Sequence, residues 1–279
     1  MTHPLYQIDA FTDRVLKGNP AAVMPLAAWL PDPVMQAVAA ENNLAETAFF
    51  VLPDDARATD ALPLRWFTPT DEVDLCGHAT LASAFVVFVH LRPDWRRVAF
   101  ATRSGVLTVA REHNGTLSMD LPARASEPFD RPDIADALGD VLGVRPQALR
   151  SAVNLMAIYQ SADEIAALTY RPELETVLKR AGAWGLSVSA PGAPPIDVVS
   201  RFFAPAKGIP EDSVTGSAHC LLAPYWTERL GRTAFEAYQA SSRGGRVGVR
   251  LDGDRVILNG TCTEYFAGRV TAELTATAD

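Results

Sequence analysis

Residues 65–69 read Arg-Trp-Phe-Thr-Pro, and an acidic turn separates them from Gly-His-Ala at residues 77–79. The same order returns later in the chain, where residues 201–205 read Arg-Phe-Phe-Ala-Pro and residues 216–218 read Gly-Ser-Ala. Each copy is a short strand pattern, an acidic turn and a Gly-x-Ala start to an apolar run. This ordered combination indicates an internal duplication, although two copies are too few for a solenoid.

The residues after each Gly-x-Ala start predict a helix enclosed by protein. From residue 78 to about residue 90 the side chains are small and apolar on every face, and residues 217–230 predict another buried helix. A helix that is apolar all round has to be buried. Each half is therefore expected to wrap a sheet around its own helix, and strand patterns separated by Ser-Gly and Asn-Gly turns supply strands for it.

The amino-terminal ends of these two helices are candidates for a binding site. A helix N-terminus presents unpaired N–H groups and about half a positive charge, so it attracts carboxylates and phosphates. Glycine at the first position, here Gly77 and Gly216, lets a ligand approach the backbone closely. Duplicated halves that face each other would aim both termini at one cleft, which would suit a small carboxylic acid.

Composition narrows the function classes further. The chain has 279 residues, of which 25 are basic and 33 acidic, and its net charge is −8. At roughly 150 residues per domain, this length predicts about two domains. A stretch rich in Pro, Ser and charge at residues 122–132 places the boundary there, so we expect halves at residues 1–121 and 122–279. An acidic chain is a poor match to nucleic acids and anionic membranes, and neither is expected as a partner.

The sequence also predicts a cytoplasmic protein. Its longest apolar stretch, residues 79–89, is far shorter than the ~20 residues that a bilayer-spanning helix requires. Asp9 stands where a signal peptide would be hydrophobic. The three cysteines, Cys76, Cys220 and Cys262, form no C-x-x-C pair, so neither a disulfide framework nor a zinc knuckle is indicated.

Several ordered motifs resemble the phenazine-biosynthesis PhzF-like family. They are Asn-Leu-Ala-Glu-Thr at residues 43–47, Asp-Leu-Cys-Gly-His-Ala-Thr at 74–80, Glu-Asp-Ser-Val-Thr-Gly-Ser-Ala-His at 211–219, and shorter pieces at 7–12, 18–23 and 243–247. The resemblance implies an α+β chain of two pseudo-symmetric domains with the diaminopimelate-epimerase-like fold, each a curved, mainly antiparallel sheet wrapped around a central helix. It also implies an active site between the domains, a homodimer and no cofactor.

The resemblance extends to chemistry. The best-understood activity of that family isomerises a dihydro-hydroxyanthranilic acid by moving a proton between carbons, with a glutamate as acid and base. Glu46 matches that glutamate, and His78 and Asp212 match the supporting histidine and aspartate. Apolar neighbours would raise the pKa of Glu46 and help it to exchange protons with carbon acids. We therefore expect a cofactor-independent isomerase acting on a small carboxylate, with these three residues as its catalytic residues.

Substrate contacts are expected at the two helix starts, where backbone N–H groups and hydroxyls are available as donors. The residues are Gly77, Ala79, Thr215, Gly216 and Ser217. One departure from the family is Ser213, where many members carry proline; it alters the rigidity of the turn. The loops at residues 54–63 and 191–195 are expected to shape the pocket.

Two other functions remain open at this stage. An amino-acid racemase or epimerase would use Cys76, which matches the first of the two thiols in the related epimerases. The second half, however, reads Ser213-Val214 where the partner thiol is expected. A catalytically idle protein that binds a small molecule or a protein partner would keep the same motifs.

A metal site is weighed on the spacing of its candidate ligands. These are Cys76, His78, His219 and Cys220. Their spacing fits no familiar zinc pattern, so no metal is expected. Cys76 and His78 are not expected to form a nucleophilic pair either, because residues two apart on a helix do not face one another.

Overall fold

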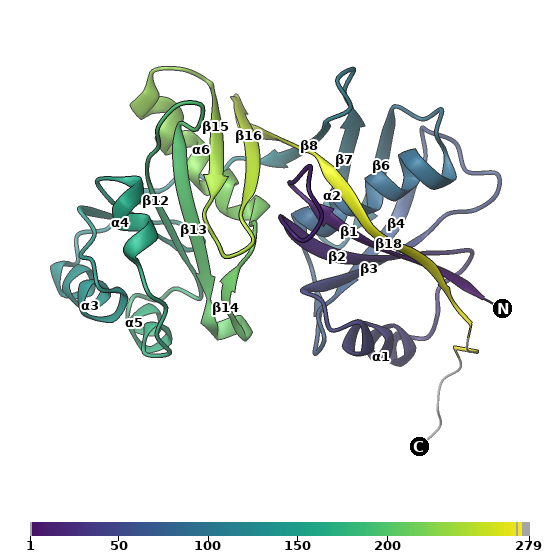
Figure 1. Ribbon diagram of the computed structural model, residues 1–279, viewed down its shortest axis with the longest axis horizontal. Coiled ribbons are helices and arrows are strands. Elements are labelled where there is room, and N and C mark those ends of the chain that lie inside the picture. The colour runs from purple at the N-terminus through teal and green to yellow at the C-terminus, as the bar shows by residue number, and fades with distance from the viewer. Residues whose placement is uncertain (1, 272, 275–279) are drawn as a thin grey trace. The chain divides into compact units, whose positions relative to one another are not determined.

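The computed structural model describes residues 2–271 together with residues 273 and 274. The chain forms two compact units, of which the second is Leu121–Leu258 and the first holds the other described residues (Figure 1). The expectation that residues 122–279 form one half is therefore wrong for the C-terminal segment. Strand β18 (Cys262–Val270) pairs antiparallel with β1 (His3–Ala10), and its ladder of hydrogen bonds makes it part of the first sheet.

The first unit surrounds one buried helix with strands. Besides β1 and β18 it contains β2 (Asn19–Leu26), α1 (Asp32–Asn42), β3 (Glu46–Val51), β4 (Ala61–Phe67), β5 (Glu72–Val73), α2 (Gly77–Val86), the π-helical turn η1 (Val87–Leu91), β6 (Arg97–Thr102), β7 (Gly105–Arg111) and most of β8 (Leu117–Pro122). Helix α2 contacts β1, β2, β3, β7 and β18. Because strands cover it on several sides, nearly all of its small side chains are buried, as the sequence predicts.

The second unit repeats this plan around helix α6 (Gly216–Leu230). Its other elements are β9 (Glu127–Pro128), α3 (Pro132–Leu142), β10 (Ala148–Ser151), β11 (Leu155–Ile158), α4 (Ala162–Ala167), α5 (Leu174–Arg180), β12 (Leu186–Pro191), β13 (Val198–Ala204), the 3₁₀ turn η2 (Pro205–Lys207), β14 (Ile209–Asp212), β15 (Ala234–Gln239), β16 (Gly245–Asp252) and most of β17 (Arg255–Gly260). Helices α3, α4 and α5 cover the outer face of β12, with Ile134, Ile165 and Leu178 in one core cluster.

The order of strand pairing is the same in both units. In the first, β1–β2 is antiparallel, β2–β3 parallel, β3–β4 antiparallel, β4–β6 parallel and β6–β7 antiparallel. In the second, β10–β11, β11–β12, β12–β13, β13–β15 and β15–β16 follow the same succession. Each parallel pair needs a crossover connection, and α2 and α6 occupy equivalent crossovers. This agreement supports the internal duplication.

The repeated Arg-x-Phe motif has the same structural role in both units. Arg65 of β4 binds both carboxylate oxygens of Glu72 at 2.7 and 2.8 Å, and Arg201 of β13 binds Glu211 at 2.6 and 2.9 Å. Each guanidinium also lies about 5 Å from the phenylalanine ring two residues further on. The expected acidic turns are thus short strands, β5 and β14, and the bidentate ion pairs join them to β4 and β13, with which they pair.

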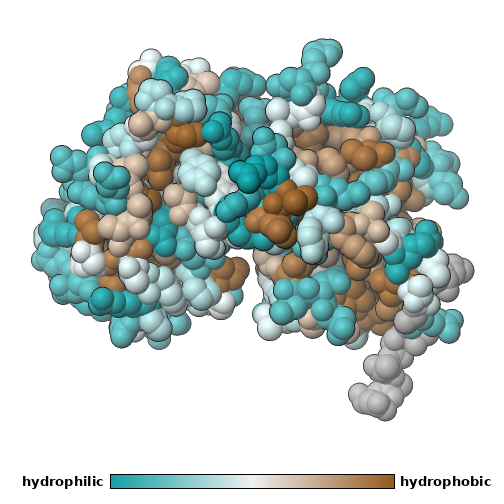
Figure 2. All heavy atoms as spheres, viewed as in Figure 1, coloured by the Kyte–Doolittle hydropathy of each residue, from teal (hydrophilic) through white to brown (hydrophobic). Residues whose placement is uncertain are grey.

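The surface is mostly hydrophilic on the face drawn in Figure 2, with hydrophobic residues in separate groups. Large apolar side chains are concentrated in the interior of each unit, such as Trp66 in the first and Trp226 in the second. Within the described residues, no helix is both long and apolar enough to cross a membrane.

Candidate active site

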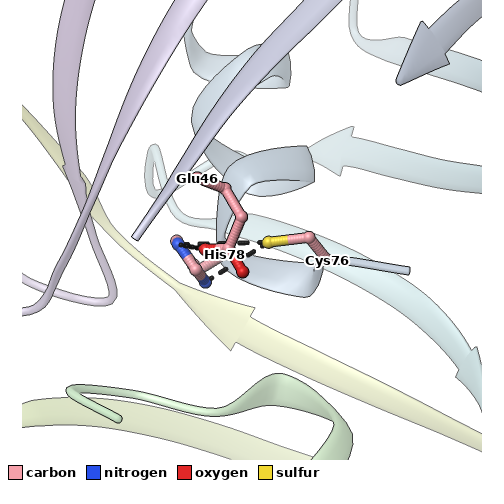
Figure 3. A group of neighbouring side chains, drawn as sticks. All are labelled: Glu46, Cys76 and His78. Atoms are coloured by element: carbon pink, nitrogen blue, oxygen red, sulfur yellow. Dashed lines mark hydrogen bonds and ion pairs between the residues drawn. The ribbon is translucent and has the colours of Figure 1, made fainter. Parts of the chain in front are cut away.

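Strand β3 and helix α2 bring Glu46 and His78 together in the first unit. Glu46 is the first residue of β3, held beside Ala21 by the parallel β2–β3 ladder, and His78 is the second residue of α2. Nε2 of His78 lies 3.0 Å from Oε2 of Glu46, and the two side chains are only 6% and 12% exposed (Figure 3). The sequence separates these residues by more than thirty positions, so the fold alone creates this pair.

Cys76 completes the group from the residue just before α2. Its Sγ lies 3.5 Å from Nδ1 and 4.0 Å from Nε2 of His78. The expectation that these two residues do not face one another is wrong, because Cys76 is the N-cap and its backbone is extended, with φ −142° and ψ 109°. The helical spacing rule applies only to residues within the helix.

Within this group the Cys76 thiol is neutral and the His78 imidazole is charged. Burial, with the nearby Glu46 carboxylate, raises the pKa of Cys76 to about 11, so the thiol keeps its proton at neutral pH. Burial alone would lower the pKa of His78, but Cys76 and Glu46 raise it, and the net direction is well upward. Since the thiol is neutral, the carboxylate is the group that favours the imidazolium.

One carboxylate oxygen of Glu46 has unused hydrogen-bonding capacity. Oε2 is buried, and no described residue offers it a well-aligned hydrogen bond, even though the imidazole is within ion-pair distance. Buried acceptors are nearly always satisfied, so an exception needs an explanation. An oxygen that is held in place and still able to accept a proton suits general base catalysis.

Asn19 also contacts His78, and no motif in the sequence marks it as a site residue. Its Nδ2 lies 3.1 Å from Nδ1 of His78, and the residue is 1% exposed. A carboxamide offers a donor or an acceptor according to which way it is turned, so Asn19 suits both protonation states of the imidazole. The only signal in the sequence was a polar residue, between Gly18 and Pro20, at the start of an apolar strand.

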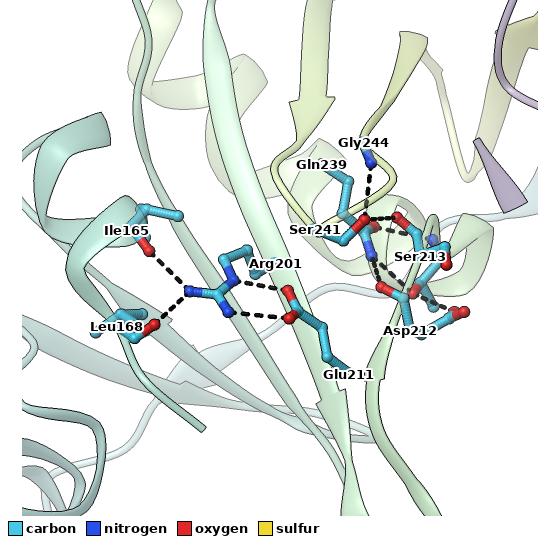
Figure 4. A network of polar contacts seen from close by, with 10 residues as sticks. Ile165, Leu168, Arg201, Glu211, Asp212, Ser213, Gln239, Ser241 and Gly244 are labelled. Carbon is cyan, nitrogen blue, oxygen red and sulfur yellow. Dashed lines mark hydrogen bonds and ion pairs between the residues drawn. The ribbon is translucent and has the colours of Figure 1, made fainter. Parts of the chain in front are cut away.

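A second polar group forms at the start of α6 in the second unit. Thr215, the N-cap residue, donates its hydroxyl to Oδ2 of Asp212 at 2.5 Å. Gln239 accepts the backbone N–H of Thr215 at 2.9 Å and donates to the carbonyl of Asp212 at 2.8 Å (Figure 4). Gln239 was also missed, although strand alternation in β15 places it inward with Phe235 and Ala237.

The remaining predicted residues lie at the two helix starts. Gly77 and Gly216 are the first residues of α2 and α6, Ala79 is fully buried and Ser217 is exposed. Neither Cys76 nor Thr215, the two N-cap residues, makes a capping hydrogen bond through its side chain. The structure therefore groups Glu46 and His78 within the first unit and groups the predicted residues of the second unit around its own helix start.

The loop at residues 54–63 does not line this group. A cavity of about 390 Å³ lies against Pro53, Asp55, Arg57 and Asp60, at the end of β3 opposite to Glu46. At about 3.3 Å per residue, the length of β3 places this loop roughly 20 Å from Glu46. The expectation that this loop shapes the pocket beside Glu46 is therefore wrong.

Comparison with known proteins places the chain in a family. The model of the phenazine biosynthesis-like proteins, PhzC-PhzF, matches residues 8–268. The chain belongs to this family. It is 45% identical over 265 residues to a protein of Pseudomonas aeruginosa that is named an uncharacterized isomerase, and the match covers 95% of this chain and 97% of that relative.

Solved structures agree with this assignment. A PhzF-family protein of Enterococcus faecalis superimposes with a TM-score of 0.89 at 38% identity, covering 98% of this chain and 100% of the other. A hydroxyproline epimerase of Agrobacterium vitis has a TM-score of 0.61 at 11% identity, covering 96% and 91% of the two chains. The second similarity concerns the fold alone, and it confirms the predicted epimerase-like α+β architecture.

Proposed function

We propose that this protein is an isomerase that moves a proton between carbon atoms of a small carboxylic acid, with Glu46 as the acid and base. The observation that supports this most directly is the buried Oε2 of Glu46, which lies 3.0 Å from an imidazole and lacks an aligned donor among the described residues. Membership of a family whose relatives are named isomerases points the same way.

Each residue of the first unit has a part in the proposed reaction. The Glu46 carboxylate takes a proton from a carbon that is acidified by a neighbouring group, and later returns it to another carbon on the same face. His78, whose Nε2 lies 3.0 Å from Oε2, holds the Glu46 side chain in position for the transfer. The first turn of α2, at Gly77 and Ala79, supplies N–H groups to negative charge that develops on the substrate, an electrostatic effect of several kcal/mol in comparable sites.

Asp212, Thr215, Gly216 and Ser217 are proposed to hold the substrate. Asp212 and Thr215 are fixed by their mutual hydrogen bond and by Gln239, and such support is what precise positioning requires. The homodimeric state, the cytoplasmic location and the independence from a cofactor stay predictions.

A thiol mechanism is the less favoured alternative. Burial and the Glu46 carboxylate raise the pKa of Cys76 to about 11, so little thiolate is present at neutral pH to act as a base. The other alternative is a binding protein without catalytic activity. Such a protein would bind a carbon acid but would not exchange its protons with solvent.

The proposal is tested by deuterium incorporation from D₂O. A dihydro-hydroxyanthranilic acid and a panel of small carboxylic acids are incubated with the protein and analysed by mass spectrometry. Glu46→Gln is expected to lower the exchange rate by at least about 10²-fold, since acid–base groups contribute that much, while the melting temperature stays near that of the wild type. Glu41→Gln, an exposed glutamate of α1, is the matched control.

Three outcomes would contradict the proposal. Exchange retained in Glu46→Gln would remove its acid–base role. Exchange lost in Cys76→Ser but kept in Glu46→Gln would assign the base to the thiol. Thermal stabilisation by an acid that undergoes no exchange would favour a binding protein, because a ligand of the native state alone raises stability by mass action.

A further inference from the structure

The proposed acid–base pair lies within a set of three chemically different metal-binding groups. Glu46, Cys76 and His78 each offer one ligand atom, and these atoms all lie within 4.8 Å of one another. They come from the start of β3, the residue before α2 and the first turn of α2, and Figure 3 shows the three side chains directed toward one another. The fold thus assembles a carboxylate, a thiol and an imidazole at a mostly buried point.

We propose that Glu46, Cys76 and His78 form an inhibitory binding site for a divalent zinc-like metal ion. Zn²⁺ binds cysteine sulfur at about 2.3 Å and histidine nitrogen or carboxylate oxygen at about 2.0–2.2 Å. Two ligands around a tetrahedral ion are then roughly 3.3–3.6 Å apart. Nε2 of His78 lies 3.0 Å from Oε2 of Glu46 and 4.0 Å from Sγ of Cys76, and all three ligand atoms lie within 4.8 Å of one another. Adjustments of about 1 Å would seat the ion.

The second ring nitrogen of His78 is an independent observation in favour of this site. A histidine that binds a metal through one nitrogen usually donates a hydrogen bond from the other, which fixes the ring. The amide nitrogen Nδ2 of Asn19 lies 3.1 Å from Nδ1. Turning the amide over, which exchanges its nitrogen and oxygen in nearly the same shape, lets the oxygen accept a hydrogen bond from Nδ1–H. In that arrangement Nε2, which lies 3.0 Å from Oε2 of Glu46, is the metal-binding atom, and Asn19 holds the ring in place.

The choice of metal follows from the ligands. A thiolate, an imidazole and one carboxylate favour Zn²⁺ or Co²⁺ over the oxygen-seeking Mg²⁺ and Ca²⁺. Binding displaces one proton from the Cys76 thiol and one from Nε2 of the His78 imidazolium, and no oxidation or reduction takes place. Three protein ligands leave the fourth tetrahedral position for a water molecule.

Metal binding would stop the reaction, and this part of the inference rests on the proposed function. The lone pair of Glu46 that would take the substrate proton becomes a metal ligand. His78 loses its charge at the same time. The site would therefore make the enzyme sensitive to free zinc, with the metal and the carbon acid competing for the same carboxylate.

Binding is tested with Co²⁺ as a spectroscopic probe on the full chain, stripped of metals with a chelator. The wild type is expected to bind one Co²⁺ per chain and to show a near-ultraviolet thiolate-to-cobalt charge-transfer band. Cys262→Ser, the matched control at a thiol outside the group, keeps this band, and Cys76→Ser loses it. Glu46→Gln keeps the band but binds Co²⁺ at least about tenfold more weakly. Zn²⁺ bleaches the band by displacement and Mg²⁺ does not.

The site is excluded if saturating Co²⁺ produces no band in the wild type, or if Cys76→Ser keeps the full band. A melting curve of Cys76→Ser establishes that loss of the band is not loss of the fold. The deuterium exchange assay separates the two proposals. Co²⁺ or Zn²⁺ that binds without slowing exchange would uphold the metal site and overturn the role of Glu46, whereas Glu46-dependent exchange without metal binding would do the reverse.

Discussion

Replacement of Asn19 by aspartate tests how the contact with Asn19 affects the protonation of His78. The change exchanges an amide for a carboxyl group of nearly the same shape, so it alters charge and leaves packing almost intact. Asn19 is 1% exposed and 3.1 Å from Nδ1 of His78. The new carboxylate would face the imidazolium directly, on the side opposite to Glu46.

The size of the effect follows from that distance. An opposite charge within about 4–6 Å shifts a pKa by roughly one to three units, which corresponds to about 1–4 kcal/mol in favour of the imidazolium. The pKa of His78 is already raised despite burial, with the Glu46 carboxylate as the nearby negative charge, and Asn19→Asp should raise it further. A histidine with a raised folded pKa contributes stability that is complete below the unfolded pKa and is lost as pH rises through the folded pKa. The variant moves that loss to a higher pH.

The assay is an NMR titration of the His78 ring nitrogens from pH 5 to pH 10. Asn19→Asp should titrate at a higher pH than the wild type, by about one unit or more. Asn114→Asp, in the exposed turn between β7 and β8, adds the same charge elsewhere and should leave the midpoint unchanged. An unchanged His78 midpoint in Asn19→Asp would refute the contact between these residues.

Two further predictions concern stability in the second unit. Arg201→Met leaves the partly buried Glu211 and the carbonyls of Ile165 and Leu168 without their donor. The free energy of unfolding, measured by chemical denaturation, should fall by about 2–4 kcal/mol. Adding Glu211→Gln should cost less in the Arg201→Met background than in the wild type. Burial lowers the pKa of His219 to about 4. The free energy of unfolding should therefore fall by about 3 kcal/mol as pH drops from about 6.5 to 4. His219→Gln should lose this part of the pH dependence, and an unchanged dependence of stability on pH in that variant would contradict the role given to His219.

The sequence predicted the fold where the pattern was local and repeated. The buried helices α2 and α6 were visible because their small apolar residues leave no polar face, and the Arg-x-Phe motifs marked the strands before them. Helix α3 was missed, although Pro132 at its first turn and Gly143 at its end are typical boundary residues. It lies just beyond a stretch rich in Pro and charge, and that composition drew attention to a linker. The return of β18 to the first sheet depends on long-range pairing, which no local pattern reveals.

Only those residues of the candidate site that match the family's motifs were predicted from the sequence. Glu46 and His78 were named from the family resemblance, and the structure brings them within 3.0 Å. Asn19, which contacts His78, and Gln239, which contacts Asp212 and Thr215, could not be found in that way, because the resemblance assigns a role to neither residue. Cys76 was misjudged for a physical reason: its position relative to His78 depends on where the helix begins, and a shift of one residue in that boundary changes which side chains meet.

The two units share a backbone plan but differ in the groups at equivalent positions, and this difference bears on the reaction. Glu46 opens β3 at its first pair with β2, and the corresponding first pair of β11 with β12 is made by Leu186. The N-cap of α2 is Cys76, whereas that of α6 is Thr215, so Thr215 rather than Ser213-Val214 takes the place of the second thiol. A leucine and a threonine cannot serve as a second base. Two-base stereoinversion needs a second base in the place equivalent to the first, and neither of these two positions of the second unit provides one. This difference supports the proposed transfer through Glu46 over a two-base racemase.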